Sequence, residues 1–273
     1  MLWAITAAAA AAPLAGCTSG PSATDRARSL VREHHEDAAI RLLRSRLVSN
    51  PDDEAARKLL ARVLALTGDL VAARREVEAL AGRLGPGDPA PYIELGRVFE
   101  LAHRYEDALS AYDQAAEVAP QRSDGPREGG MRAARWGESE QAVPRLEEAV
   151  RRGARDAETW HALGLARVHT GDMPGAQSAY RASIAADPRS AEGWLGLATL
   201  ALMRGDALGA LDAYGQVLAR RPRFAPAELG RAWALGSLGR KEEAAQALDR
   251  AEALGAPAAN VARQRQRLER PSP

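Results

Sequence analysis

Residues 157–188 read AETWHALGLARVHTGDMPGAQSAYRASIAADP. Small and apolar residues recur in this stretch at helical spacing, on both sides of the dipeptide Gly171-Asp172. They are Trp160, Leu163 and Gly164 before the dipeptide and Ala176, Tyr180 and Ser183 after it. Because glycine and aspartate favour a turn, and because Pro188 cannot continue a helix, the stretch predicts two helices joined by a tight turn and closed at Pro188.

Alanine marks the same phase in seven consecutive segments of the chain, at intervals of 34 or 35 residues: Ala39, Ala73, Ala108, Ala142, Ala176, Ala210 and Ala244. Six of these alanines are preceded, twelve positions earlier, by a second small residue: Ala61, Gly96, Gly130, Gly164, Ala198 and Ala232. A larger apolar residue follows every alanine by four positions. Two helices can approach closely only where the contact lacks bulk, so the small residues mark the expected crossing point within each pair.

The 34-residue pattern resembles the tetratricopeptide repeat, a helix-turn-helix unit. The resemblance implies an all-α protein, a right-handed α-solenoid superhelix of about six to seven repeats with a C-terminal capping helix. The expected repeats are residues 20–53, 54–88, 89–122, 123–156, 157–190, 191–224 and 225–258, followed by a capping helix and tail at 259–273. The repeats at 20–53 and 123–156 fit the pattern least well.

The fourth expected repeat is rich in helix-breaking residues. Its first helix contains Gly125, Gly129 and Gly130, and its second contains Pro144. Each interior glycine lowers helix stability by about 1 kcal/mol relative to alanine, and an interior proline removes a backbone hydrogen bond. The sequence therefore predicts a weak joint in the array at this repeat, with neutral sequence drift as the alternative.

The composition argues against several classes of function. Lysine plus arginine number 37 against 36 acidic residues, a net charge of +1 that gives no reason to expect a nucleic-acid partner. A single cysteine excludes an internal disulfide and a cysteine-based zinc cluster. His161 and His169 lack a further ligand at metal spacing, and no catalytic motif is present. We therefore expect no enzymatic activity, no cofactor, no metal and no small-molecule substrate.

The N-terminus carries features of an exported protein. Residues 2–13 form an uncharged apolar run, too short to span a bilayer as a helix but suited to a signal peptide. The following Leu14-Ala15-Gly16-Cys17 resembles the lipobox of bacterial lipoproteins. The resemblance implies a signal peptide at 1–16, lipidation of Cys17 and a tether at 17–22 that holds the array against the membrane.

No lysine or arginine precedes the apolar run, so either translation starts upstream or the signal is weak. An alanine-rich helix with an incidental cysteine is the alternative reading. Thr18 stands where the sorting rule of bacterial lipoproteins expects aspartate for inner-membrane retention. The resemblance thus implies an envelope protein on the outer membrane, facing the periplasm.

Tetratricopeptide arrays bind partner peptides or helices on the concave wall formed by their first helices, which identifies candidate binding residues here. The expected groove is basic in repeats two to four, at Lys58, Arg62, Arg97, Arg127 and Arg135. It is mainly apolar in repeats five to seven, at His161, Leu165, Val168, Leu195, Leu202, Met203, Leu229 and Trp233. Such a groove would suit an amphipathic protein segment with an acidic flank. Trp233 is either a binding hot spot or a packing residue under the cap.

The layout of lipobox, short tether and repeats resembles the pilotin group of lipoproteins, which assist type IV pilus secretins, and the tight-adherence pilus lipoproteins. This resemblance implies a non-enzymatic scaffold that acts in pilus assembly. Two alternatives stay open. One is an adaptor for peptidoglycan enzymes or a periplasmic protease, and the other is a structural module that associates with itself.

Overall fold

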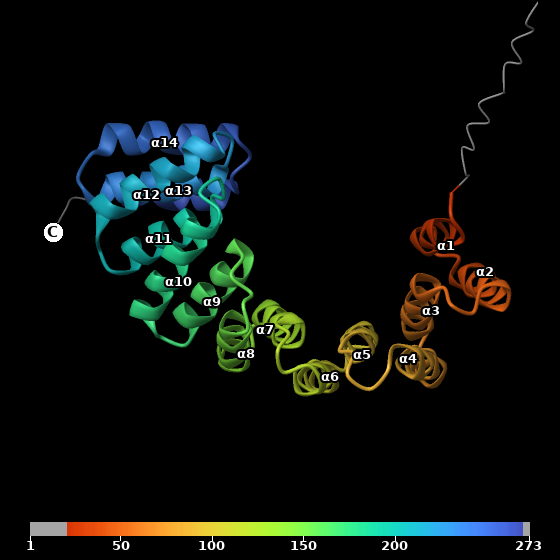
Figure 1. Ribbon diagram of the computed structural model, residues 1–273. Helices are drawn as coiled ribbons and strands as arrows, with labels where there is room; N and C mark the ends of the chain where they lie inside the picture. The colour runs from red at the N-terminus through yellow and green to blue at the C-terminus, as the bar shows by residue number, and fades with distance from the viewer. Residues whose placement is uncertain (1–20, 270–273) are drawn as a thin grey trace, which may run out of the picture. The chain divides into compact units, whose positions relative to one another are not determined.

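The computed structural model describes residues 21–269, which form fifteen helices and contain no strand (Figure 1). In chain order the helices are α1 (Ala23–Arg32), α2 (Glu36–Ser49), α3 (Glu54–Leu66), α4 (Leu70–Leu84), α5 (Ala90–Leu101), α6 (Tyr105–Val118), α7 (Asp124–Trp136), α8 (Ser139–Arg151), α9 (Ala157–His169), α10 (Met173–Ala186), α11 (Glu192–Met203), α12 (Ala207–Arg220), α13 (Ala225–Ser237), α14 (Lys241–Ala253) and α15 (Ala258–Glu269). The predicted signal peptide and Cys17 lie outside the described residues.

The helices form two compact units, Met1–Glu76 and Val77–Pro273, with the division inside α4. In the N-terminal unit, α1 packs on α2 and both contact α3. In the C-terminal unit, each helix from α5 to α15 packs on the next, and the first helices α5, α7, α9, α11 and α13 also contact one another in sequence. Each expected repeat holds one helix pair, and the predicted all-α solenoid is confirmed.

The turns inside the helix pairs explain where the helices end. Five of these turns carry a glycine with φ between 73° and 86°, among them Gly171. The equivalent residues of the first and third repeats are His34 and His103, with φ of 59° and 58°. A left-handed backbone is costly for a histidine. The His103 Nδ1 atom lies 3.1 Å from the Tyr105 hydroxyl, a contact that glycine could not make.

The predicted crossing points are indeed close contacts. A Cβ atom added to Gly96 would lie 2.6 Å from the ring of Tyr112, and one added to Gly164 would lie 2.6 Å from the ring of Tyr180. Both distances are too short for carbon atoms. Glycine at these positions therefore lets the second helix of the pair lay an aromatic ring directly on the first helix.

The glycines of the fourth repeat allow close helix packing, both at Gly130, the predicted crossing point, and at Gly125, where the sequence predicted only a weaker helix. A Cβ on Gly125 would lie 2.6 Å from the backbone nitrogen of Ala116, and one on Gly130 would lie 2.7 Å from Leu146. The helix α7 runs unbroken through these glycines, and α8 runs through Pro144. These glycines lower the helix propensity of α7, but they allow the neighbouring helices to approach closely.

Tyr112 is the largest fully buried side chain of the array. It joins the apolar cluster that also contains Phe99, Leu109, Leu146 and Leu163. Its hydroxyl oxygen has no hydrogen-bond partner among residues 21–269. Burial raises the pKa of this hydroxyl far above its usual value, so Tyr112 is neutral at every physiological pH.

Arginines in or just after the second helices connect the fourth repeat to the third and the sixth repeat to the fifth. Arg145 of α8 binds Asp113 of α6 with two hydrogen bonds of 2.9 and 2.6 Å. Arg152, just after α8, donates to the backbone carbonyl of Ala116 at 2.8 Å. Arg220 of α12 donates to the carbonyl of Pro188 at 2.8 Å. Both Arg145 and Arg152 are mostly buried, so these bonds add to the helix packing between repeats.

Candidate protein-interaction face

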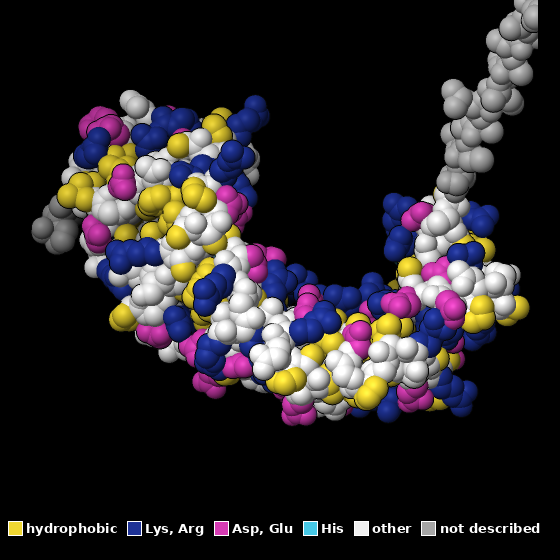
Figure 2. Space-filling view, viewed as in Figure 1, with side chains coloured by type: hydrophobic (Ala, Val, Ile, Leu, Met, Phe, Trp, Pro, Cys, Tyr) yellow, Lys and Arg dark blue, Asp and Glu magenta, His cyan; other side chains and the backbone are white. Residues whose placement is uncertain are grey.

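The first helices α9, α11 and α13 carry seven of the apolar residues that the sequence assigned to the groove. We call these residues the apolar face: Leu165, Val168, Leu195, Leu202, Met203, Leu229 and Trp233. Three of them are substantially exposed, Leu165 at 40%, Met203 at 56% and Trp233 at 45%. Figure 2 shows hydrophobic side chains gathered over α9 to α13. Large apolar side chains that stay exposed on neighbouring helices are typical of an interaction surface.

The other members of the apolar face are half-buried. Leu195 and Leu202 pack against the cluster around Ala198 and Tyr214, and Leu229 packs against the cluster around Leu248. These side chains contribute to the solenoid core as well as to the surface. Changing them would therefore disturb folding, whereas Leu165, Met203 and Trp233 are the residues whose role in binding can be tested separately.

Trp233 contacts the capping helix and remains accessible. The guanidinium carbon of Arg267, in α15, lies 4.0 Å from the centre of the Trp233 ring. This is a close cation–π contact, which holds the indole plane in place. Packing under the cap is one of the two sequence-based predictions for Trp233, and the contact with Arg267 of the capping helix is present. The other interpretation, that Trp233 is a binding hot spot, stays a prediction.

His161 lies on α9 and its ring centre is 5.7 Å from that of Tyr180 in the same repeat. Burial lowers the pKa of His161, against the opposing influence of Glu192 and Glu158. The imidazole is therefore neutral at pH 7, because its pKa lies below the ordinary value of 6.5. Burial also raises the pKa of Tyr180 to about 12. His161 and Tyr180 therefore contribute uncharged side chains to this part of the site.

In the C-terminal unit, the predicted basic residues are mostly engaged with acidic partners. Arg97 lies 3.6 Å from Glu94 and 3.6 Å from Glu128. Arg127 lies 3.3 Å from Asp156 and 2.8 Å from Glu158. Their charges are thus largely balanced within the array.

Asp156 shows the strength of this pairing. Burial alone would raise its pKa, but hydrogen bonds from Arg127 and Thr159 outweigh that effect and hold the pKa of Asp156 at about 2. In the same unit Arg135 is exposed, and no ion pair joins it to a described residue. In the N-terminal unit Lys58 lies 3.3 Å from Glu54, and Arg62 is half-buried. Partner binding by these five residues stays a prediction.

An aromatic contact at the turns of the third and fourth repeats was not expected from the sequence. The rings of Tyr105 and Trp136 lie 4.6 Å apart, and the His103 ring stands edge-on to Tyr105 at 6.1 Å. Both aromatic residues fall outside the repeat pattern. Aromatics at non-repeat positions in consecutive repeats were the signal that could have revealed this contact.

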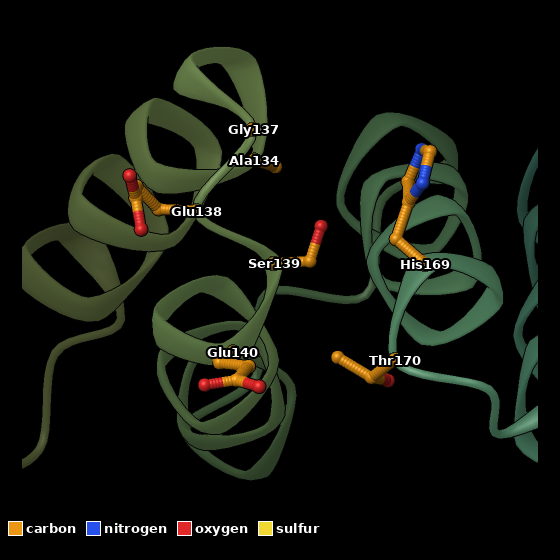
Figure 3. Close-up of a pocket in the computed structure, with 7 residues that line it drawn as sticks. All are labelled: Ala134, Gly137, Glu138, Ser139, Glu140, His169 and Thr170. Atoms are coloured by element: carbon orange, nitrogen blue, oxygen red, sulfur yellow. The ribbon is translucent and has the colours of Figure 1, made fainter.

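A hollow of about 470 Å³ lies between the fourth and fifth repeats, lined by Ala134, Gly137, Glu138, Ser139, Glu140, His169 and Thr170. Figure 3 shows the Ser139 hydroxyl directed into the space toward α9, while the carboxylates of Glu138 and Glu140 point away from it. No hydrogen bond joins Ser139 to His169. The side chains of this hollow therefore lack the paired nucleophile and base of a hydrolytic site.

Two further observations concern the residues that the structure describes. Between residues 21 and 269, no group of three or more His, Cys, Asp or Glu side chains is placed to hold a metal ion. None of the fifteen helices in this range is both long and apolar enough to cross a membrane.

The chain resembles several solved structures at low sequence identity. MamA is 20% identical, with 61% of this chain and 91% of that chain covered at a TM-score of 0.58. YrrB, described as a TPR protein with an unusual peptide-binding site, is 19% identical, with 68% and 96% covered at a TM-score of 0.60. The C-terminal part of a TPR protein from Cytophaga hutchinsonii is 16% identical, with 88% and 98% covered at a TM-score of 0.65. Such identities establish similarity of fold.

No curated protein matches this chain in sequence. The family model of the tetratricopeptide repeat matches residues 24–89, 128–191, 161–214 and 195–259. These ranges cover well over half of the sequence and include the helices that carry the apolar face. The chain therefore belongs to the tetratricopeptide repeat family.

Proposed function

We propose that this protein is a non-enzymatic adaptor that binds a segment of a partner protein on the apolar face of α9, α11 and α13. The observation that carries the proposal is the exposure of Leu165, Met203 and Trp233 on three first helices that contact one another in sequence. Exposed apolar side chains of this size on one surface favour burial by a partner. An aromatic and a methionine side chain are also residue types that interfaces prefer.

We further propose that the partner is a protein of the bacterial cell envelope, because the lipobox at Leu14-Ala15-Gly16-Cys17 would anchor the array to a membrane. Assembly of a pilus secretin in the outer membrane is the specific role that the layout of lipobox, tether and repeats favours. The sequence resemblance supports this role in secretin assembly, and identification of the partner tests it.

Replacement of Leu165, Met203 and Trp233 by alanine is expected to reduce partner binding more than 100-fold. Loss of two or three central apolar contacts removes about 3 kcal/mol or more of binding free energy. Partners are identified by crosslinking and purification from membranes, and the affinity of the purified partner is then measured for each variant. Recovery of a secretin supports the pilus role, and recovery of a peptidoglycan enzyme contradicts it.

A matched control uses three exposed aliphatic residues outside the apolar face, Val48, Val71 and Leu208, also replaced by alanine. Both triple variants should keep the helical circular dichroism of the wild type, because the altered side chains are exposed. Equal affinity of the wild type and the first variant would contradict the proposed site. Equal loss in both variants would show a general effect of surface hydrophobicity.

Cys17→Ser is expected to move the protein from the membrane fraction to the soluble fraction without changing its helical content. Serine lacks the thiol that carries the lipid, and residue 17 precedes the first helix, which begins at Ala23. The measurement is fractionation of cells that express each form, with the membranes washed in high salt. A serine variant that stays in the washed membranes would refute lipid anchoring.

A further inference from the structure

Three arginines recur at the repeat period along one edge of the C-terminal unit. Arg155, Arg189 and Arg223 are separated by 34 residues each and lie in the turns that precede α9, α11 and α13. All three are exposed. No ion pair, side-chain hydrogen bond or ring contact joins any of these three side chains to the part of the chain that the structure describes.

The neighbouring charges at these turns are already engaged with one another. Arg127 binds Asp156 and Glu158, next to Arg155. Arg221 binds Glu192, near Arg223 and Arg189. The Asp187 carboxylate accepts a hydrogen bond of 2.9 Å from the backbone nitrogen of Arg189. The three free guanidinium groups therefore supply positive charge that the acids around them do not pair.

The three arginines lie at the N-terminal ends of the helices that carry the apolar face, and Leu165, Met203 and Trp233 lie in later turns of the same helices. Arg127 stands on the first helix α7, at a position of the predicted groove, and its Nε atom reaches Asp156 at 3.3 Å. Because Arg155 is the residue next to Asp156, the turn that carries Arg155 lies close to Arg127, near the N-terminal ends of α7 and α9. The turns with Arg189 and Arg223 hold the same place in the following repeats. We call these three residues the arginine row.

The spacing of the arginine row indicates the secondary structure of a partner segment that could pair with it. The helices α9, α11 and α13 contact one another in sequence, and packed helices have axes about 8–10 Å apart. Seven residues of an α-helix rise about 10.5 Å and return to the same face. In a β-strand, side chains on one side are about 6.6 Å apart, and every second one of them is about 13 Å apart. Neither spacing matches the distance between the packed helix axes.

Resting on the proposed function, we infer that the partner segment is an amphipathic α-helix with carboxylates every seven residues along one border of its apolar stripe. The stripe would cover Leu165, Met203 and Trp233, and the carboxylates would meet Arg155, Arg189 and Arg223 in turn. The acidic residues of the partner thus run along its length. The sequence predicted a partner with acidic residues at one end only. That arrangement is not favoured, because Arg97 and Arg127 are already paired with acidic residues of the array.

The test is selection from two displayed peptide libraries on the full-length protein in detergent. One library holds amphipathic helices with a fixed leucine stripe and randomised border positions. The other holds proline-rich peptides, whose extended helix repeats every three residues at about 9.3 Å and could also match the row. We expect helices to be enriched, with Asp or Glu at border positions seven residues apart.

The selected helices are then measured on two triple variants by fluorescence anisotropy. Arg155→Gln, Arg189→Gln and Arg223→Gln together should weaken binding about tenfold, since exposed ion pairs contribute about 0.5 kcal/mol each. The control changes three exposed arginines of the second helices α4 and α10 in the same way, Arg74, Arg75 and Arg181, and should leave binding unchanged. Added salt should weaken binding to the wild type more than to the first variant.

The outcomes separate this inference from the proposed function. Enriched helices without periodic acids, or equal affinity for wild type and the variant of the arginine row, would overturn the inference while the adaptor role stands. Enrichment of the proline-rich library alone would overturn the helical partner. Helices that bind equally well after Leu165, Met203 and Trp233 are changed to alanine would contradict the proposed binding face itself.

Discussion

Gly125→Ala is expected to lower the free energy of unfolding of the C-terminal unit by about 2–3 kcal/mol. The added methyl group would lie 2.6 Å from the backbone nitrogen of Ala116 and 2.9 Å from the carbonyl carbon of Ala115. Backbone atoms cannot rotate away as a side chain can, so α6 and α7 must separate and lose contact. Overpacking of this kind outweighs the gain in helix propensity of about 1 kcal/mol that alanine brings.

Gly215→Ala is the matched control, because Gly215 lies within α12 and a Cβ there would meet nothing within 4 Å. This variant should gain up to about 1 kcal/mol from helix propensity alone. The measurement is urea unfolding followed by circular dichroism at 222 nm. Equal gains in both variants would mean that α6 and α7 do not approach as closely as the structure indicates.

Tyr112→Ala is expected to destabilise the C-terminal unit by about 3–5 kcal/mol. The side chain is fully buried, with its ring against Gly96 of α5 and its Cβ atom against Gly129 of α7. Alanine would leave a cavity that two helices border, and such cavities are among the most damaging core changes. The same urea titration measures the loss.

Tyr112→Phe separates the ring from its hydroxyl group. The hydroxyl is buried without a hydrogen-bond partner among the described residues, so its removal should leave stability within about 1 kcal/mol of the wild type or raise it. A loss above about 2 kcal/mol for the phenylalanine variant would show that the hydroxyl is bonded after all. The two substitutions together test both the packing and the polar cost of this residue.

The helix pairs could be predicted from the sequence because their determinants recur at a fixed period. Glycine or alanine in the first helix and a larger apolar residue four positions after the alanine of the second helix report contacts within one repeat, such as Gly164 with Tyr180. The positions expected in the groove followed from the resemblance to the tetratricopeptide repeat. Leu165, Met203 and Trp233 are exposed, as a binding surface requires.

The charge of the groove could not be read in the same way, because a side chain is balanced by residues of another repeat. Arg127 looks free in its own repeat, yet its partners Asp156 and Glu158 lie about thirty residues further along the chain. The contact of Trp233 with Arg267 agrees with one of the two sequence-based predictions for Trp233, which was packing under the capping helix. By contrast, the 34-residue spacing of the arginine row is visible in the sequence itself.

Arginines in or just after the second helices give two junctions of the array a polarity. Arg145, Arg152 and Arg220 each bind a group that lies about thirty residues nearer the N-terminus. Removal of repeats from the C-terminal end would take away donors and leave carbonyls and carboxylates that water can hydrate. Removal from the N-terminal end would strand guanidinium groups that are partly enclosed by their own repeat. At these two junctions the donor belongs to the later repeat, so loss of repeats from the C-terminal end leaves fewer enclosed arginines unpaired there than loss from the N-terminal end.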